Sequence, residues 1–177
     1  DLSRFSEAEK IAFYINLYNA GMLKAVFDAY PLESVKNIGL IPFSIFKKKF
    51  IEQNGRLLSL DGIEKGILFE DHFDPRIHFA VNCASESCPP LLDAPYTAKD
   101  LESQLAEQTR AFANSSRAAR LNSKTGRIEF SELFKWYDSH FEGDDPAEYL
   151  NQYRETPLPL GAETGWIKYD WSLNLAQ

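Results

Sequence analysis

Residues 6–30, SEAEKIAFYINLYNAGMLKAVFDAY, decide the fold because they predict one long helix. Ser6 and Glu9 form a capping box, in which the Ser side chain accepts a bond from the Glu9 N–H and the Glu side chain reaches back to the Ser6 N–H. Pro31 cannot continue a helix, so we expect this one to run to about Tyr30. Apolar residues cover almost its whole circumference, which is the pattern of a central helix covered by other elements.

The remaining patterns predict shorter helices and strands around this helix. Ser59 and Ser131 are placed to cap helices, and Asp145-Pro146 is a typical helix start. The run 76–81, RIHFAV, is β-branched and aromatic, which favours a buried strand. We expect helices over about 60–69, 101–114, 131–137 and 145–154, and strands over 76–81, 125–130 and 165–171.

Together these elements predict an α+β fold, with a central buried N-terminal helix and additional helices packed on a small, mainly antiparallel sheet. The chain has 177 residues, of which 44% are hydrophobic, so it is long enough to bury a core and short enough for one domain. We therefore expect residues 1–177 to form a single domain.

Composition excludes several classes of function. A net charge of −7 argues against a nucleic-acid partner, because phosphate binding depends on clusters of Lys and Arg. The best candidate for a membrane span, residues 11–27, is interrupted by Asn16, Asn19 and Lys24, so we expect no span. The sequence has no phosphate-binding loop and no dinucleotide fingerprint, so it predicts neither an ATP nor an NAD cofactor.

The one basic run is Lys47-Lys48-Lys49, between two phenylalanines. Charge runs of this kind usually face water at the edge of a helix or strand. Contact with an anion or a lipid headgroup is the alternative.

Cys83 is the candidate nucleophile. It follows the predicted strand and is surrounded by small residues, so its thiol should be reachable and backbone N–H groups can point at an anion. His78 is the candidate base. Residues five apart on a strand point to opposite faces, so the turn after Asn82 would have to bring the two together.

Asn16, Asn19 and Glu64 are candidate helpers. The two asparagines lie three residues apart on one face of the long helix, where a buried amide must be satisfied. Their ordinary role is to tie the helix to neighbouring backbone, and the alternative is to orient His or Cys. Glu64 is either an acid or base or an ordinary surface carboxylate.

Three interpretations of the cysteine segment remain open. In the structural one, Cys83 and Cys88 are buried small residues or a local disulfide, and His78 is a hydrogen-bonded core residue. In the catalytic one, the Cys83 thiolate attacks a carbonyl and loop N–H groups hold the oxyanion. In the third, both cysteines and His78 bind a metal, although their spacing matches no familiar zinc site. The aromatic residues Trp166, Tyr169 and Trp171 indicate closure of the core.

Five segments occur in an order that is similar to a known family and span nearly the whole chain. They are AFYINLYNA (12–20), LSLDGIE (58–64), DPRIHFAVNCAS (74–85), CPPL (88–91) and YDWSLN (169–174). With these blocks the chain resembles the domain of unknown function 547 family. The resemblance implies no established activity.

The sequence departs from the family pattern at several positions. Tyr14 stands where the family usually has Trp, and Lys65 stands where it usually has His. If that His were the catalytic base, this protein would lack it. Eukaryotic relatives often have Ser at the position of Cys88, whereas the position of Cys83 is more regularly Cys, which favours a thiol role at Cys83 over an essential disulfide or a Cys-pair metal site.

The resemblance also carries an expectation about location. Bacterial members of the family commonly look exported and have more sequence before the first block. We therefore expect a processed or trimmed extracytoplasmic protein, periplasmic or anchored through a missing N-terminal segment. An oxidising environment of that kind makes a Cys83–Cys88 bridge feasible.

From these patterns we predict a cysteine-dependent hydrolase or acyl-transfer enzyme, with Cys83 as nucleophile and His78, Asn19 and Glu64 as catalytic helpers, and with no cofactor or metal. The alternative is a non-catalytic binding module, in which the Cys83–Cys88 loop is structural and the surface recognises a peptide or another protein. An enzyme needs a reachable sulfur in a concave pocket, within hydrogen-bond reach of an imidazole or carboxylate. A binding module predicts a buried or bridged sulfur and an exposed apolar patch.

Overall fold

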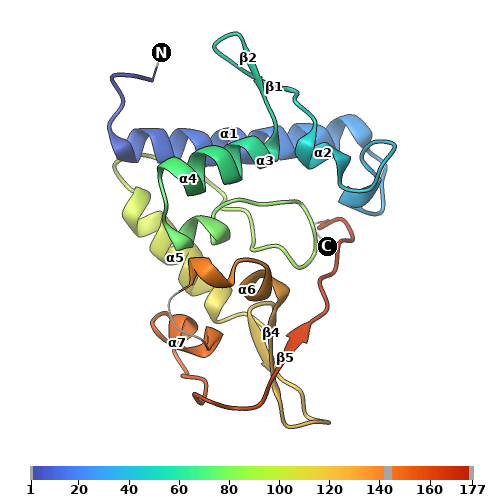
Figure 1. The fold of residues 1–177 in the computed structure, drawn as a ribbon, viewed down its shortest axis with the longest axis vertical. Coiled ribbons are helices and arrows are strands. Elements are labelled where there is room, and N and C mark those ends of the chain that lie inside the picture. Colours follow the sequence, from blue (N-terminus) through green and yellow to red (C-terminus); the bar gives the residue numbers. More distant parts are fainter. Residues whose placement is uncertain (1, 142–144, 176–177) are drawn as a thin grey trace.

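The computed structural model describes residues 2–141 and 145–175 and has an α+β fold (Figure 1). The predicted fold class is confirmed. The helices are α1 (Glu7–Ala29), α2 (Ser44–Lys47), α3 (Leu60–Ile63), α4 (Phe69–Asp71), α5 (Leu101–Ala113), α6 (Glu132–Trp136) and α7 (Pro146–Asn151). The strands are β1 (Ile51–Gln53), β2 (Arg56–Leu58), β3 (Ala119–Leu121), β4 (Ile128–Ser131) and β5 (Thr164–Ile167). Within the described residues, no helix combines the length and the hydropathy that crossing a bilayer requires.

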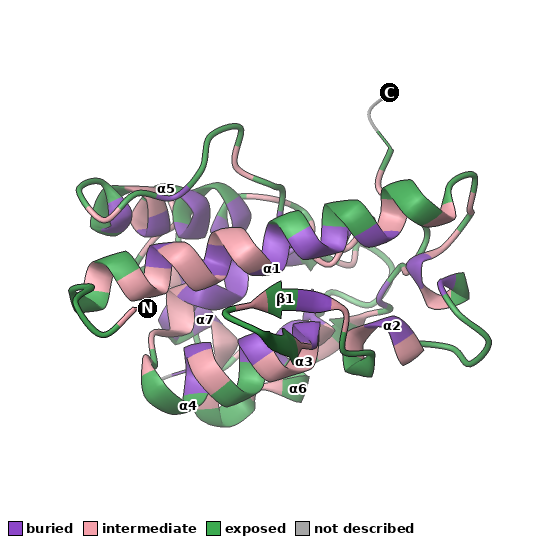
Figure 2. Ribbon diagram, turned by 90° about the horizontal axis from the view of Figure 1, so that it is seen from above, coloured by how far each residue is buried: buried purple, intermediate pink, exposed green. Residues whose placement is uncertain are grey.

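Helix α1 begins and ends where the sequence predicts. Ser6 Oγ accepts from the Glu9 N–H at 3.3 Å, and Glu9 Oε2 accepts from the Ser6 N–H at 2.7 Å, so the capping box is complete. One face of the helix is buried through Ile15, Tyr18 and Met22. The other face is open along part of its length (Figure 2), where Phe27 is 82% exposed. The helix is therefore central along one face only.

The strands form two small sheets. Strands β1 and β2 make an antiparallel hairpin through Asn54 and Gly55, which both have positive φ as a tight hairpin turn requires. The second sheet has the order β3-β4-β5, with an antiparallel β3–β4 pair and a parallel β4–β5 pair. Antiparallel pairing thus predominates, as predicted, and β3 was not foreseen.

Residues 76–81 do not form the predicted strand. Pro75–Phe79 is a 3-10 helix, and Asp74 Oδ1 accepts from the Arg76 N–H at 2.8 Å as its N-cap. Proline at the first helical position fixes a helical φ and needs no hydrogen-bond partner, so Asp74-Pro75 starts a helical turn here. Two clusters of buried side chains meet at this turn, because Ile77 belongs to the cluster around α1 and Phe79 to the cluster around α5 and β4.

Other predicted boundaries shift by a few residues. The helix expected over 60–69 continues to Asp71, but its middle, Glu64–Leu68, is a π-helical turn. The last strand ends at Ile167 rather than at residue 171. Residues beyond it leave the sheet and pair with the cysteine loop, as described below.

Asn19 ties α1 to the start of the cysteine loop. Its Nδ2 donates to the Ala80 carbonyl oxygen at 2.9 Å, and its Oδ1 accepts from the Asn82 N–H at 2.8 Å. Asn16 makes the equivalent pair of bonds with the Tyr96 backbone, at 2.8 and 2.9 Å. Both amides therefore have the ordinary role of fastening helix to backbone, and neither bonds to an imidazole or a thiol.

We expect Asn19→Ala to lower the free energy of unfolding by ~2–4 kcal/mol, because it leaves two buried backbone groups without partners. Urea unfolding of the variant and the wild type measures the difference. Asn37→Ala, at an exposed asparagine, is the matched control and should change stability by less than about 0.5 kcal/mol. Equal effects of the two substitutions would contradict a fastening role for Asn19.

Candidate functional site

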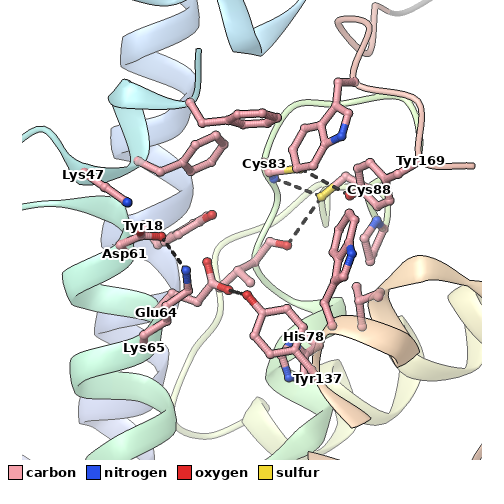
Figure 3. Close-up of a pocket in the computed structure, with 17 residues that line it drawn as sticks. Tyr18, Lys47, Asp61, Glu64, Lys65, His78, Cys83, Cys88, Tyr137 and Tyr169 are labelled. Atoms are coloured by element: carbon pink, nitrogen blue, oxygen red, sulfur yellow. Dashed lines mark hydrogen bonds and ion pairs between the residues drawn. The ribbon is translucent and has the colours of Figure 1, made fainter. Parts of the chain in front are cut away.

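A pocket of about 560 Å³ lies between the N-terminal helices, α6 and the C-terminal segment (Figure 3). Its volume is within the range of sites for small ligands. Most of the lining is apolar or aromatic, with a few polar groups. The lining residues are Tyr18, Phe43, Phe46, Lys47, Asp61, Glu64, Lys65, His78, Val81, Cys83, Cys88, Pro89, Leu133, Trp136, Tyr137, Tyr169 and Trp171.

Cys83 is a partly buried, free thiol in the pocket wall. The Ser85 hydroxyl lies 3.0 Å and the Tyr169 hydroxyl 3.5 Å from its Sγ. Hydrogen bonds from Cys88, then from Ser85 and Tyr169, lower the pKa of Cys83 to about 7, although burial acts in the opposite direction. At neutral pH a substantial fraction of this residue is therefore thiolate, the form that attacks carbonyls.

Cys88 has the opposite character. It is buried, and burial followed by the neighbouring Cys83 raises its pKa well above the usual value. Its Sγ accepts from the Cys83 N–H at 3.0 Å and lies 3.9 Å from the Val81 carbonyl oxygen. Cys88 therefore stays protonated, and its thiol is the neighbour that does most to lower the pKa of Cys83. The two sulfurs are not bridged.

The loop that carries both cysteines is held rigid by side chains. Asn82 Oδ1 accepts from the Ala84 N–H at 2.8 Å, and Asn82 Nδ2 donates to the Pro89 carbonyl oxygen at 2.7 Å. Arg117 donates to the Cys88 carbonyl oxygen at 3.0 Å. Ala84, next to Cys83, has a φ of +59°, a conformation that costs free energy for any residue with a Cβ and that persists only when its surroundings enforce it.

The predicted oxyanion hole of loop N–H groups is not present. Every N–H from residue 83 to residue 88 already has a partner, and only that of Ser85 points at the Cys83 sulfur. The acceptors of the others are Cys88 Sγ for Cys83, Asn82 Oδ1 for Ala84, and the carbonyl oxygens of Ser172, Asp170 and Ser85 for Glu86, Ser87 and Cys88. A substrate oxyanion would have to be held by side chains.

The C-terminal segment 169–174 completes the pocket by pairing with this loop. Ser85 and Leu173 form an antiparallel bridge, and the Asn174 N–H donates to the Ala84 carbonyl oxygen at 2.9 Å. This pairing brings Tyr169 to Cys83 and places Trp171 in the pocket wall. Tyr169 is buried and Trp171 packs against the core around α1, as predicted, and both also line the pocket.

Glu64 belongs to the π-helical turn and lies in a different wall of the pocket from Cys83 (Figure 3). It is 9% exposed, and its Oε1 accepts from the Tyr137 hydroxyl at 2.9 Å. Burial raises the pKa of this carboxyl, although hydrogen bonds from Tyr137 and Tyr18 oppose the shift. Glu64 is therefore a buried carboxyl group, and its interpretation as a surface carboxylate is wrong. π-Helical turns are rare and are often found at functional sites.

His78 lines the pocket but does not contact Cys83. Its Nε2 lies 2.9 Å from Nδ1 of His140, and its ring stacks on Phe69 with the centroids 4.2 Å apart. Burial, and then the nearby His140, lower the pKa of His78 to about 3. The imidazole is therefore neutral at physiological pH. Its ring also packs on Tyr137, 4.3 Å between centroids, so His78 supports the tyrosine that binds Glu64.

The sequence patterns thus identified some members of the site and missed others. Cys83, His78 and Glu64 line one pocket, whereas Asn19 lies behind it and fastens the loop. The aromatic members Phe43, Trp136 and Tyr137 had no local signal, because only the fold brings them to the cysteine. Among the residues that the structure describes, no three His, Cys, Asp or Glu side chains form a group that could hold a metal ion.

The structure combines an α+β fold with a cysteine-containing pocket. The family described as "Protein of unknown function, DUF547" matches residues 2–113, and the chain belongs to this family. No curated protein matches the chain, and no solved structure matches it either. The matched region contains Cys83, Cys88, Glu64 and His78, while Tyr137, Tyr169 and Trp171 come from the part of the chain beyond it.

We expect Cys83 to react with iodoacetamide with a pH midpoint near its pKa of about 7. In Cys88→Ala the midpoint should rise, because the largest cause of the lowered pKa is lost. Ser85→Ala should raise it less. Alkylation rates measured by peptide mass analysis from acid to alkaline pH test this. A midpoint that stays the same without Cys88, or labelling that requires unfolding, would contradict the assigned hydrogen bonds.

We also expect His78 to weaken the fold in acid. Between its ordinary pKa of 6.5 and its folded value of about 3, the unfolded state binds a proton that the folded state does not. His78 makes its full contribution to the free energy of unfolding above its ordinary pKa. At about pH 5 this contribution is smaller by roughly 2 kcal/mol. Urea unfolding of wild type and His78→Phe at both ends of this range measures it. Parallel pH dependences of the two proteins would rule out this role.

Proposed function

We propose that this domain is a cysteine-dependent hydrolase or acyl-transfer enzyme with Cys83 as nucleophile. The observation that carries the proposal is a thiol whose pKa is lowered to about 7, reachable from a pocket of about 560 Å³. Structural cysteines are usually buried and have raised pKa values, as Cys88 has. Donors to the sulfur stabilise the thiolate that nucleophilic catalysis requires.

In the proposed reaction, the Cys83 thiolate attacks the carbonyl carbon of an ester or amide and forms a tetrahedral intermediate. The Tyr169 hydroxyl, whose pKa is raised by burial and then by the two cysteines, stays protonated and can donate to the oxyanion. Collapse of the intermediate breaks the bond to the leaving group and leaves a thioester on Cys83. Water, or another nucleophile, then takes the acyl group and releases the thiolate.

Glu64 is the proposed general acid. A carboxyl whose pKa is raised by burial holds its proton closer to neutral pH than an exposed one, so it can protonate a leaving group. The resulting carboxylate accepts a proton from the water that hydrolyses the thioester. Tyr137, which bonds to Glu64 and packs on His78, is a positioning residue, and so is His78.

His78 has a different role in this proposal from the base that the sequence predicts. A neutral imidazole already bonded to His140 has no contact with the sulfur, and Cys83 needs no base if its thiolate is populated at neutral pH. Asn19 contributes by holding the backbone on both sides of Val81, two residues before the nucleophile. Neither residue needs to touch the substrate.

A non-catalytic binding pocket is the second candidate. Its support is the aromatic wall, in which the Trp136 and Trp171 rings stack 5.9 Å apart and the Phe43 ring meets Trp171 edge-on at 4.7 Å. Such a wall suits a flat ring or an apolar side chain of a peptide. The two candidates make different predictions for Cys83. An enzyme of the proposed kind forms an acyl group on Cys83, and a binding pocket does not.

Two esters with the same acyl group separate the proposed roles. 4-Nitrophenyl acetate has a leaving group that needs no protonation, whereas ethyl acetate needs an acid. We expect Glu64→Gln to keep the acetyl burst with the nitrophenyl ester and to slow hydrolysis of the ethyl ester by about 10²-fold or more. Stopped-flow absorbance and product analysis measure the two rates, and Glu70→Gln, an exposed carboxylate nearby, is the matched control.

Intact-mass analysis after rapid acid quenching identifies the acylated residue. The expected result is one acetyl group on wild type and on Glu64→Gln, and none on Cys83→Ala. Acetylation that persists without Cys83, or that never occurs on the folded protein, would sink the enzyme proposal and favour the binding pocket. If Cys83 is acetylated but Glu64→Gln slows acylation of Cys83 by both esters equally, the acid assigned to the leaving group is wrong.

A further inference from the structure

A basic segment with an exposed apolar tip occupies one end of the molecule. Residues 34–51 contain four lysines and no Asp or Glu, although the whole chain has a net charge of −7. Three of these lysines, Lys47, Lys48 and Lys49, are consecutive and exposed, and none has an ion-pair partner among the described residues. In Figures 1 and 2 this segment lies around α2, beside the C-terminal end of α1.

The apolar tip consists of Leu40 and Ile41, in the turn just before α2. Leu40 is 104% exposed and Ile41 is 70% exposed, so both side chains project into solvent. Gly39, with φ +104°, lies so close to Ser44 that an added Cβ would be 2.4 Å from the Ser44 hydroxyl oxygen. The Ser44 N–H donates to the Ile41 carbonyl oxygen at 3.0 Å. These contacts within the turn fix its shape, so Leu40 and Ile41 project away from the rest of the molecule.

The base of the tip is fixed to the rest of the molecule. The Phe43 ring meets the Trp171 ring edge-on at 4.7 Å, and Lys36 lies over the Phe43 ring, 5.7 Å from its centroid. Hydrogen bonds from Ser172 lower the pKa of Asp170, and the charge of Lys36 contributes to the same shift, so an acid partly offsets this lysine. The unpaired positive charge of the segment is thus concentrated in Lys47, Lys48 and Lys49.

We propose that residues 39–49 dock the protein on an anionic lipid bilayer, with Leu40 and Ile41 entering the headgroup layer and the three consecutive lysines facing anionic headgroups. Apolar side chains beside basic ones are the combination that binds peripheral proteins to membrane surfaces. The occupant is a bilayer rather than a protein, because two projecting side chains have much less surface than the ~1,000 Å² that a stable protein interface buries.

The docking segment also contributes to the pocket. Phe43, Phe46 and Lys47 belong to both, so the surface that meets the bilayer is continuous with one wall of the pocket. The docking proposal does not depend on catalysis by Cys83. A protein that binds vesicles without acyl transfer, or acylates without binding vesicles, would separate the two.

Co-sedimentation with vesicles tests the docking. We expect binding to phosphatidylcholine vesicles that contain phosphatidylglycerol and at least about tenfold weaker binding to phosphatidylcholine alone. Leu40→Ser with Ile41→Ser should weaken binding about tenfold or more, because the inserted apolar surface is lost. Changing Lys47, Lys48 and Lys49 to Gln should weaken binding to the anionic vesicles by about a hundredfold and remove most of its salt dependence.

Leu121→Ser with Leu160→Ser is the matched control, since these leucines are also exposed, at 68% and 60%, but lie elsewhere. It should leave vesicle binding unchanged. The proposal is overturned if the protein sediments with neither vesicle, if the control weakens binding as much as the tip variant, or if the three-lysine variant binds as well as wild type. It is also overturned if the tip variant changes only the oligomeric state in gel filtration, which would make the tip a contact between copies of the chain.

Discussion

The structure depends on hydrogen bonds to the backbone N–H and C=O groups of the loop over residues 80–90, which has almost no regular secondary structure. Residues 80–90 are largely buried, and buried N–H and C=O groups must find partners. Four side chains from four parts of the chain supply many of these partners, namely Asn19, Asn82, Gln108 and Arg117. Because the loop is held from several sides, it can keep the left-handed conformation at Ala84 and present a thiol at a fixed place.

Among the residues that the structure describes, the thiol of Cys83 has hydroxyl, thiol and backbone groups as hydrogen-bonding neighbours and no Lys or Arg side chain. Hydroxyl, thiol and backbone donors stabilise the thiolate of Cys83, and the same surroundings raise the pKa of Tyr169 and of Glu64. At Cys83 the hydrogen bonds outweigh the effect of burial, whereas at Glu64 burial outweighs the hydrogen bonds. Local structure thus shifts the pKa of the Cys83 thiol and that of the Glu64 carboxyl in opposite directions.

The sequence predicted features that depend on neighbours along the chain and missed those that depend on distant ones. The capping box at Ser6 and the Asp-Pro start at residue 145 were interpreted correctly. Asp74-Pro75 also begins a helical turn, but the β-branched and aromatic run after it favoured a strand over 76–81. The partner of His78 lies 62 residues away, and Tyr169 lies 86 residues from Cys83, so no local pattern could reveal either contact.

The pairing of the cysteine loop with the C-terminal segment also sets an order of events during synthesis. Ser87 and Asp170 are 83 residues apart, so the ribosome makes the loop well before the strand-like segment that holds it. Until that segment emerges, Cys83 lacks the Tyr169 hydroxyl and the pocket lacks one wall. A nascent or truncated chain therefore carries this cysteine without the surroundings that tune it, and the thiol reaches its final reactivity only when the C-terminal segment is in place.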